Sequence, residues 1–123
     1  MEYMQSNDKQ IKIFTSAVAV GAGVTGVTSQ NGSGLTVART GVGTYTLTLD
    51  KRMYALVGAN VIVQGSTLEY LYGQVTEFDN TTTPNAPVVT MKLFKTDTAA
   101  AADVANACTL LFTLIMKNSS LTR

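Results

Sequence analysis

The chain has 123 residues, a net charge of +1 and no histidine, and charged side chains make up 14% of it, against roughly 25% in typical soluble domains. A chain of this length fits one domain with a modest core. Because it has no basic cluster, it lacks the electrostatic footprint of a nucleic-acid-binding protein. Its apolar runs, such as residues 110–112, are too short to span a bilayer. We therefore expect neither nucleic acid nor a membrane as a partner.

The first third of the chain combines polar residues, one strand pattern and many glycines. Residues 1–10 lack the basic start and apolar centre of a secretory signal peptide, so we expect no secretion. Residues 11–18 read as a strand, whereas residues 21–34 contain five glycines and no helical period. Because glycine loses the most entropy on folding, we predict a flexible Gly-rich N-terminal arm or extended segment with one possible strand at residues 1–33, followed by a folded domain at residues 34–123.

Residues 35–49 carry the strongest local pattern in the chain. Large side chains alternate with threonine or alanine on both sides of a turn flanked by Gly41 and Gly43. A period of two on both arms of a tight turn predicts an antiparallel hairpin with one buried face. The alternating residues of that face are Leu35, Val37, Arg39, Tyr45, Leu47 and Leu49.

Further strand patterns follow the hairpin. They cover residues 59–64, 68–78, 89–93 and 108–116, and Gly73 suggests a bulge or bend in the second of them. Six or seven short strands, with turns about every 8 to 12 residues, favour a small antiparallel β-sandwich or a jelly-roll-like β-barrel. Crossover helices are missing from the pattern, which argues against a parallel α/β sheet. The sequence therefore predicts an all-β fold.

The residue types needed for catalysis are scarce. Without histidine, the chain cannot build Ser-His-Asp, Cys-His or histidine-metal sites. Glu69 and Glu77 are a possible carboxylate pair, but a glycosidase holds such a pair in a cleft, for which a chain of this size has little room. We interpret both as residues of a solvated strand edge. The single cysteine, Cys108, lies beside an apolar strand and is interpreted as a buried, inert thiol.

Two groups of oxygen-bearing side chains could offer ligands to calcium. They are Asp79 with Asn80, and Asp97 with Asp103. Neither group matches the spacing of a calcium-binding loop, and an aspartate in a turn has a local hydrogen-bonding role of its own. We therefore expect turn residues at these positions, and a protein that is not an enzyme, with no catalytic, cofactor-binding or metal-binding residues and no cofactor.

The last predicted strand is apolar on both faces, with four large side chains on one face and Leu111 and Ile115 on the other. Tyr70 and Tyr72 likewise alternate with apolar residues. A two-layer sandwich covers only one face of each sheet. Either a long loop or the N-terminal arm covers the second face, or another subunit does, since exposed apolar patches mark interfaces.

Residues 35–50, LTVARTGVGTYTLTLD, resemble a hairpin that is common in small structural proteins of tailed bacteriophages. The order downstream is also similar, with a strand at residues 59–64, a strand containing Gln74-Val75, and an Ala/Asp-rich loop at residues 97–103. An apolar last strand then runs into Lys-Asn-Ser-Ser at residues 117–120. The resemblance covers roughly residues 34–121 and lies in the order and pattern of the strands, not in a catalytic motif.

Such phage proteins are generally capsid decoration (cement) proteins or other small virion components. The resemblance implies a protein made in the host cytoplasm and located on the capsid surface of the virion, where a homotrimer clamps the major capsid protein from outside. From the surplus apolar faces of their strands, we expect the oligomer or capsid contacts at Tyr70, Tyr72, Leu111 and Ile115. A tail, neck or fibre-associated virion protein is the first alternative. The second is a carbohydrate- or receptor-binding β-module, whose sugar site would use aromatic faces.

Overall fold

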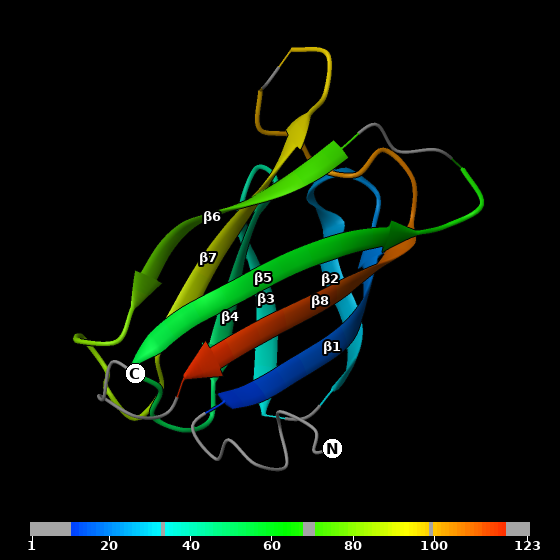
Figure 1. Cartoon of the computed structure of the whole chain (residues 1–123). Coiled ribbons are helices and arrows are strands. Elements are labelled where there is room, and N and C mark those ends of the chain that lie inside the picture. The colour runs from blue at the N-terminus through cyan, green and yellow to red at the C-terminus, as the bar shows by residue number, and fades with distance from the viewer. Residues whose placement is uncertain (1–10, 33, 68–70, 99, 118–123) are drawn as a thin grey trace, which may run out of the picture.

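The chain folds as a sandwich of two antiparallel sheets (Figure 1). The structure, a computed structural model, describes residues 11–32, 34–67, 71–98 and 100–117. Sheet A has the strand order β2-β1-β8-β5, and sheet B has the order β3-β4-β7-β6. Because the first and last strands of each sheet do not pair with each other, neither sheet closes into a barrel, and the fold is the sandwich of the two predicted architectures. No helix among the described residues has the length and apolar character needed to cross a membrane.

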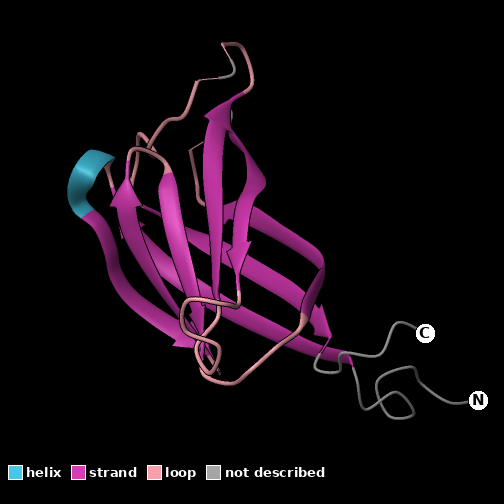
Figure 2. Ribbon diagram, turned by 90° about the vertical axis from the view of Figure 1, so that its left-hand side faces the viewer, coloured by secondary structure: helices cyan, strands magenta, loops and turns pink. Residues whose placement is uncertain are grey.

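The elements follow one another in a simple order. They are β1 (Ile11–Gly21), the 3-10 turn η1 (Gly23–Thr25), β2 (Gly26–Gly32), β3 (Leu35–Gly41), β4 (Thr44–Leu49), β5 (Ala55–Gln64), β6 (Leu71–Asp79), β7 (Val88–Lys95) and β8 (Cys108–Lys117). Figure 2 shows the two layers from the side, with the strands of one sheet crossing those of the other at an angle.

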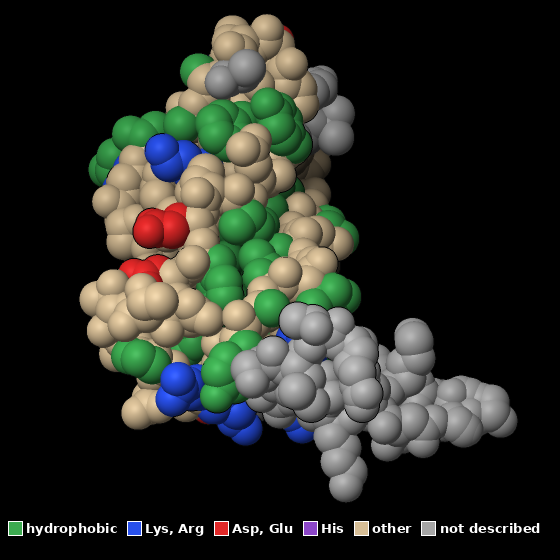
Figure 3. Space-filling view, turned by 60° about the vertical axis from the view of Figure 1, so that its left-hand side comes forward, with side chains coloured by type: hydrophobic (Ala, Val, Ile, Leu, Met, Phe, Trp, Pro, Cys, Tyr) green, Lys and Arg blue, Asp and Glu red, His purple; other side chains and the backbone are tan. Residues whose placement is uncertain are grey.

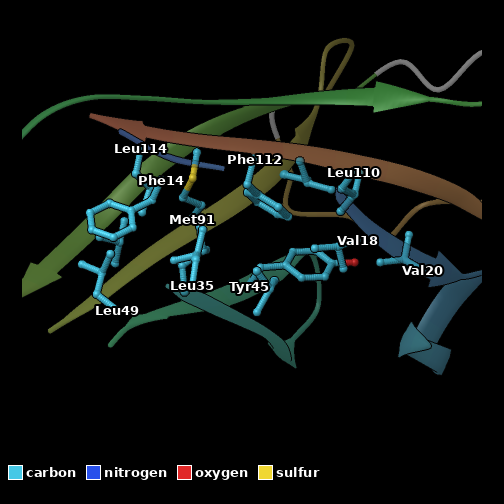
Figure 4. Packing of buried hydrophobic residues seen from close by; sticks show 14 of the residues in the cluster. Phe14, Val18, Val20, Leu35, Tyr45, Leu49, Met91, Leu110, Phe112 and Leu114 are labelled. Carbon is cyan, nitrogen blue, oxygen red and sulfur yellow. The ribbon is translucent and has the colours of Figure 1, made fainter. Parts of the chain in front are cut away.

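The core lies between the sheets and is formed by alternate residues of the inner strands (Figure 4). Leu47 of β4 and Leu114 of β8 are fully buried. The rings of Tyr45 and Phe112 meet across the two sheets with their centroids 6.0 Å apart. Burying a large apolar side chain stabilises a fold by roughly 1.5–3 kcal/mol. The alternate residues of these strands therefore stabilise the sandwich, because they bury their side chains between the sheets.

The predicted hairpin is confirmed as β3 and β4. Leu35 pairs with Leu49, and Val37 pairs with Leu47. These side chains all face the core. Gly43 ends the turn with a φ of 60°, and a Cβ there would lie 2.6 Å from the carbonyl oxygen of Ala102. Glycine is therefore required at this position both by the backbone conformation and by the neighbouring loop.

The predicted strand at residues 11–18 is confirmed as part of β1, whereas residues 21–32, predicted as an arm or extended loop, form the end of β1, the 3-10 turn and the edge strand β2 of sheet A. β1 pairs with β8 from Ile11 to Val20, and it contributes Phe14 and Val18 to the core. β2 pairs with β1 as an edge strand and is mostly exposed. The glycine-rich segment can form β2 because the backbone hydrogen bonds that pair it with β1 require no apolar side chain. Gly32 allows the close approach, since a Cβ on it would lie 2.5 Å from the Thr15 carbonyl oxygen.

Gly73 does not form the predicted bulge. It pairs with Leu93 in regular register, and the irregularity in β6 lies between Val75 and Glu77. A Cβ on Gly73 would collide with the Val61 side chain of the facing sheet. The glycine therefore serves close packing between β6 and β5.

Candidate functional site

The outer face of sheet A carries apolar side chains from three neighbouring strands. The register places Ile13 of β1 beside Ile115 of β8. Four residues further along β1 and β8, Ala17, Leu111 and Ile62 lie in one row across β1, β8 and β5. Ile11, Lys117 and Gln64 stand at the ends of this outer face. Its middle part, which we call the uncharged face, is formed by Ile13, Thr15, Ala17, Ala19, Gly58, Asn60, Ile62, Thr109, Leu111, Thr113 and Ile115.

No member of the uncharged face is an acidic or basic residue. Ile13 is 45% exposed and Ile62 is 55% exposed, while Leu111 and Ile115 between them are half-buried by their neighbours. Of the N-terminal segment that was one candidate to cover this face, residues 11–32 form β1, the 3-10 turn and β2 of the same sheet, and residues 1–10 lie outside the described residues. Contiguous exposed apolar surface of this kind marks contacts with other molecules.

A shallow depression indents the uncharged face beside the edge strand β5. It has a volume of about 160 Å³ and is lined by Ala59, Asn60, Thr113 and Ile115. It lies next to Gly58, which pairs with Ile115 and has no side chain to fill the space. Ligand pockets in proteins usually measure roughly 300–1,000 Å³. The depression is therefore of a size for one side chain of another molecule, not for a cofactor or metabolite.

The remaining predicted contact residues do not join this surface. Tyr72 is 44% exposed and pairs with Phe94 on the outer face of sheet B, where the two rings stack with their centroids 5.6 Å apart. Leu111 and Ile115 lie on the outer face of sheet A, so the structure separates them from Tyr72 by the thickness of the sandwich. Tyr70 lies outside the described residues.

The outer face of sheet B has a different chemistry, because threonines dominate it. Thr46 lies at its centre between Ala38 of β3 and Thr90 of β7. The hydroxyls of Thr40 and Thr46 are 3.1 Å apart and share a hydrogen bond. The two outer faces are therefore unequal, one polar and hydroxyl-rich and the other largely apolar.

A third apolar region follows the side of the sandwich where β5 and β6 lie. Half-buried side chains from both strands pack against the core there. Figure 3 shows hydrophobic side chains gathered down the middle of this side. They are Leu56, Ala59, Val61, Val63, Leu71, Val75 and Phe78. We call this region the β5–β6 seam, and it adjoins the uncharged face along β5.

Two of the carboxylates considered as calcium ligands, Asp79 and Asp103, accept hydrogen bonds from neighbouring groups of the fold. Asp103 accepts hydrogen bonds from Arg39 Nε at 2.9 Å, from Arg39 Nη2 at 2.8 Å and from the Gly43 amide at 2.9 Å. The Arg39 guanidinium holds the pKa of Asp103 below its usual value. Asp79 accepts from the amides of Thr81 and Thr82, which lower its pKa well below the usual range. The interpretation of Asp79 as a turn residue is therefore confirmed.

Glu77 is exposed on β6 and its proposed companion Glu69 lies outside the described residues. Within the residues that the structure describes, no three metal-ligating side chains come together. Burial raises the pKa of the Tyr45 phenol to about 12, which suits a core residue. Cys108 is half-buried and packs against the core.

The interpretation of the sequence missed the Arg39–Asp103 ion pair and the exposed Ile62, although the sequence contains a signal for each. Arg39 stands in the inward set of the hairpin, and a charge in that set requires a buried partner. Ile62 lies among the outward residues of β5, where alternation alone identifies it as an exposed apolar side chain. Neither signal identifies the segment that Arg39 or Ile62 contacts, because those contacts form only in the folded chain.

Comparisons of the chain with protein-family models, with curated proteins and with solved structures find no match.

Proposed function

We propose that the chain is a non-enzymatic structural protein of a tailed-phage virion, which decorates the outside of the head and binds the major capsid protein. The observation that carries the proposal is the uncharged face of sheet A, where Ile13 and Ile62 are exposed beside Leu111 and Ile115. A surface of this kind is suited to binding another protein. The resemblance of residues 35–50 to phage hairpins supports the choice of a virion.

The physical chemistry of this face favours stable contact with a protein lattice. Covering apolar surface contributes roughly 25 cal/mol per Å². Lys117 lies at the end of this outer face, so its charge can keep its hydration when the middle of the face is covered. The strands that carry the face are fixed by ladders on both sides of β8, with β1 from Ile11 to Val20 and with β5 regularly from Gly58 to Gln64. A preordered surface of this kind loses little conformational entropy on binding.

Multivalent binding would strengthen such contacts. The resemblance implies three copies in one assembly, and linked copies bind a repeating lattice more tightly than single ones. The trimer stays a prediction of the resemblance alone.

A carbohydrate- or receptor-binding module is the second candidate function, and Tyr72 favours it. Its ring is 44% exposed on the outer face of sheet B and is stacked on Phe94. Exposed aromatic faces are the usual platform for sugars. The polar groups that would fix a sugar there are Gln74 and Lys92, which pair with each other in the adjacent row.

Electron microscopy of intact virions with gold-labelled antibodies against this protein tests the proposal. We expect label over the surface of the head. Label confined to the tail, neck or fibre base would contradict decoration and favour the tail alternative. Particles without any label would contradict a virion protein altogether, and binding of the free protein to glycans, lost in Tyr72→Ala, would favour the carbohydrate module.

A further inference from the structure

The four edge strands of the sandwich are not protected equally. β2 and β5 are the edges of sheet A, and β3 and β6 are the edges of sheet B. An edge strand presents unpaired backbone N–H and C=O groups that attract another strand. Proteins usually blunt such edges with charged side chains, bulges, proline or a covering segment.

The edge strands β2 and β3 lie side by side, and a side chain of β2 hydrogen-bonds to the backbone of β3. The Gln30 side chain of β2 donates from Nε2 to the Val37 carbonyl at 3.0 Å, and its Oε1 accepts from the Val37 amide at 2.8 Å. The amide group of Gln30 thus takes the place of a neighbouring strand for the backbone of β3. Arg39 packs beside Gly26 at the same corner.

The edge of β6 is guarded by charge and by an irregular backbone. Glu77 and Asp79 stand near its end. The ladder with β7 shifts register between Val75 and Glu77. Both features discourage pairing with another strand.

The edge of β5 has none of these protections over most of its length. Ala55–Gln64 contains no charged residue and no proline. Its one irregularity lies between Leu56 and Gly58, and the ladder with β8 is regular from Gly58 to Gln64. Among the described residues, the backbone groups of β5 form no hydrogen bonds besides those of this ladder. Val57 and Ile62 are 59% and 55% exposed on this strand.

We infer that β5 is a strand-pairing site for β5 of a second copy of this chain. The two strands run antiparallel across a twofold axis at Asn60, and they join two copies of sheet A into one continuous sheet of eight strands. The inference goes beyond the proposed function and does not rest on it, because it concerns only the contact between copies.

The axis is placed at Asn60 because β5 is self-complementary about that residue. In this register Ile62 of one copy lies directly opposite Gly58 of the other, on the same face of the joined sheet. Gly58 has no side chain, and the depression of about 160 Å³ lies beside it. The exposed Ile62 side chain therefore fills the depression of the second copy, and the symmetry repeats this contact. The two Asn60 amides face each other at the axis, where each can both donate and accept a hydrogen bond.

The pairing also covers apolar surface that the single copy leaves open. A strand added beyond β5 lies next to the β5–β6 seam, where half-buried side chains such as Val61 and Val75 reach the surface. It also makes the uncharged faces of the two copies continuous. Pairing through a twofold axis gives two copies, whereas the phage resemblance implies three, so a measured mass separates the two.

The first test is the mass of the full-length protein by size exclusion with light scattering at tens of micromolar concentration. One chain has a mass of 13.0 kDa, and we expect twice that value. Ile62→Lys places a charge on the pairing edge and is expected to give single chains. Ile13→Lys is the matched control, because Ile13 is exposed on the same uncharged face but on an inner strand. Circular dichroism checks that both variants are folded.

The Ile13→Lys protein is expected to remain paired. Equal loss of pairing in both variants would mean that the copies meet through the whole face and not through the edge of β5. A wild-type mass of one chain, or of three, would also overturn the inference.

The second test fixes the register. In a Cys108→Ala background, Asn60→Cys places two thiols opposite each other at the axis, about 4.5–5.5 Å apart at Cβ, which is close enough for a disulfide after a small adjustment. Gln64→Cys is the control, since in this register Gln64 lies opposite Leu56 of the second copy. On mild oxidation we expect a covalent dimer from Asn60→Cys and at least tenfold less from Gln64→Cys. Equal yields, or none from either, would contradict an axis at Asn60.

Discussion

Ser16 is a polar side chain in the apolar interior of β1. It is 3% exposed, and its hydroxyl has no hydrogen-bond partner among the described residues. A buried polar group without a partner costs roughly 1–3 kcal/mol. We therefore expect Ser16→Ala to raise the free energy of unfolding by about 1 kcal/mol, measured by urea denaturation.

The neighbouring Thr15 provides the control for this substitution. Its side chain points to the outer face of the same strand and is exposed, so Thr15→Ala should change the stability by less than about 0.5 kcal/mol. If Ser16→Ala instead lowers the free energy of unfolding, the hydroxyl has a favourable contact in the folded protein.

For single residues, the sequence predicts which face of the sheet a side chain occupies but not which residue it contacts. Alternation correctly places Leu47 in the core and Thr46 on the opposite face. The same alternation puts Arg39 on the inward side, but it cannot name Asp103 as the partner, because the two are 64 residues apart and meet only in the fold. A side chain's direction is a local property of a strand, whereas its partner is a tertiary one.

The loop between β7 and β8 is fastened to the β3–β4 hairpin by Asp103. The Asp103 carboxylate accepts hydrogen bonds from Arg39 and from the Gly43 amide. The Arg39 side chain is 17% exposed and the Asp103 side chain is 11% exposed. The hydrogen bonds from Arg39 lower the pKa of Asp103 in the folded protein, whereas an unfolded aspartate has a pKa of about 3.9. The pair therefore stabilises the fold fully above about pH 4, and this contribution is lost as the pH falls below that value.

The substitution Asp103→Asn tests this contribution. We expect the wild-type melting temperature to fall more steeply than that of Asp103→Asn as the pH is lowered from about 5 to about 3. Asp97→Asn, a change at an exposed position of the same loop, should leave the wild-type profile unchanged. Asp79 also has a lowered pKa, so some acid sensitivity remains in every variant. Parallel profiles for wild type and Asp103→Asn would show that the ion pair does not fasten the loop.

At the level of elements, the sequence predicts the strands that bury an apolar face and misses the one that does not. β3, β4, β7 and β8 all have alternating or continuous apolar residues, and each was predicted near its observed bounds. β2 has a single buried residue, Gly26, so its hydrophobic pattern is absent. It is held by backbone pairing with β1, which leaves no trace in the pattern of side chains.

In the whole molecule, the all-β fold and part of the candidate site could be predicted, but not the arrangement of the sheets. Leu111 and Ile115 were identified because they are apolar on the outward face of a strand whose inward face is already apolar. Ile13 joins them only because β1 pairs with β8, so that the start of the described chain lies against its end. Long-range pairing of this kind has no local signature. The uncharged face is therefore a property of the folded molecule.

We propose above that the uncharged face of sheet A binds a phage head. The direct measurement is the melting temperature of heads prepared without this protein, after mixing with purified wild type, with Leu111→Asp, or with Thr46→Asp. Leu111→Asp puts a charge into the middle of the uncharged face, whereas Thr46→Asp puts one on the outer face of sheet B. We expect wild type and Thr46→Asp to raise the melting temperature of the heads and Leu111→Asp to leave it unchanged. Heads that are not stabilised by the wild-type protein, or that are stabilised equally by all three, would contradict the claim.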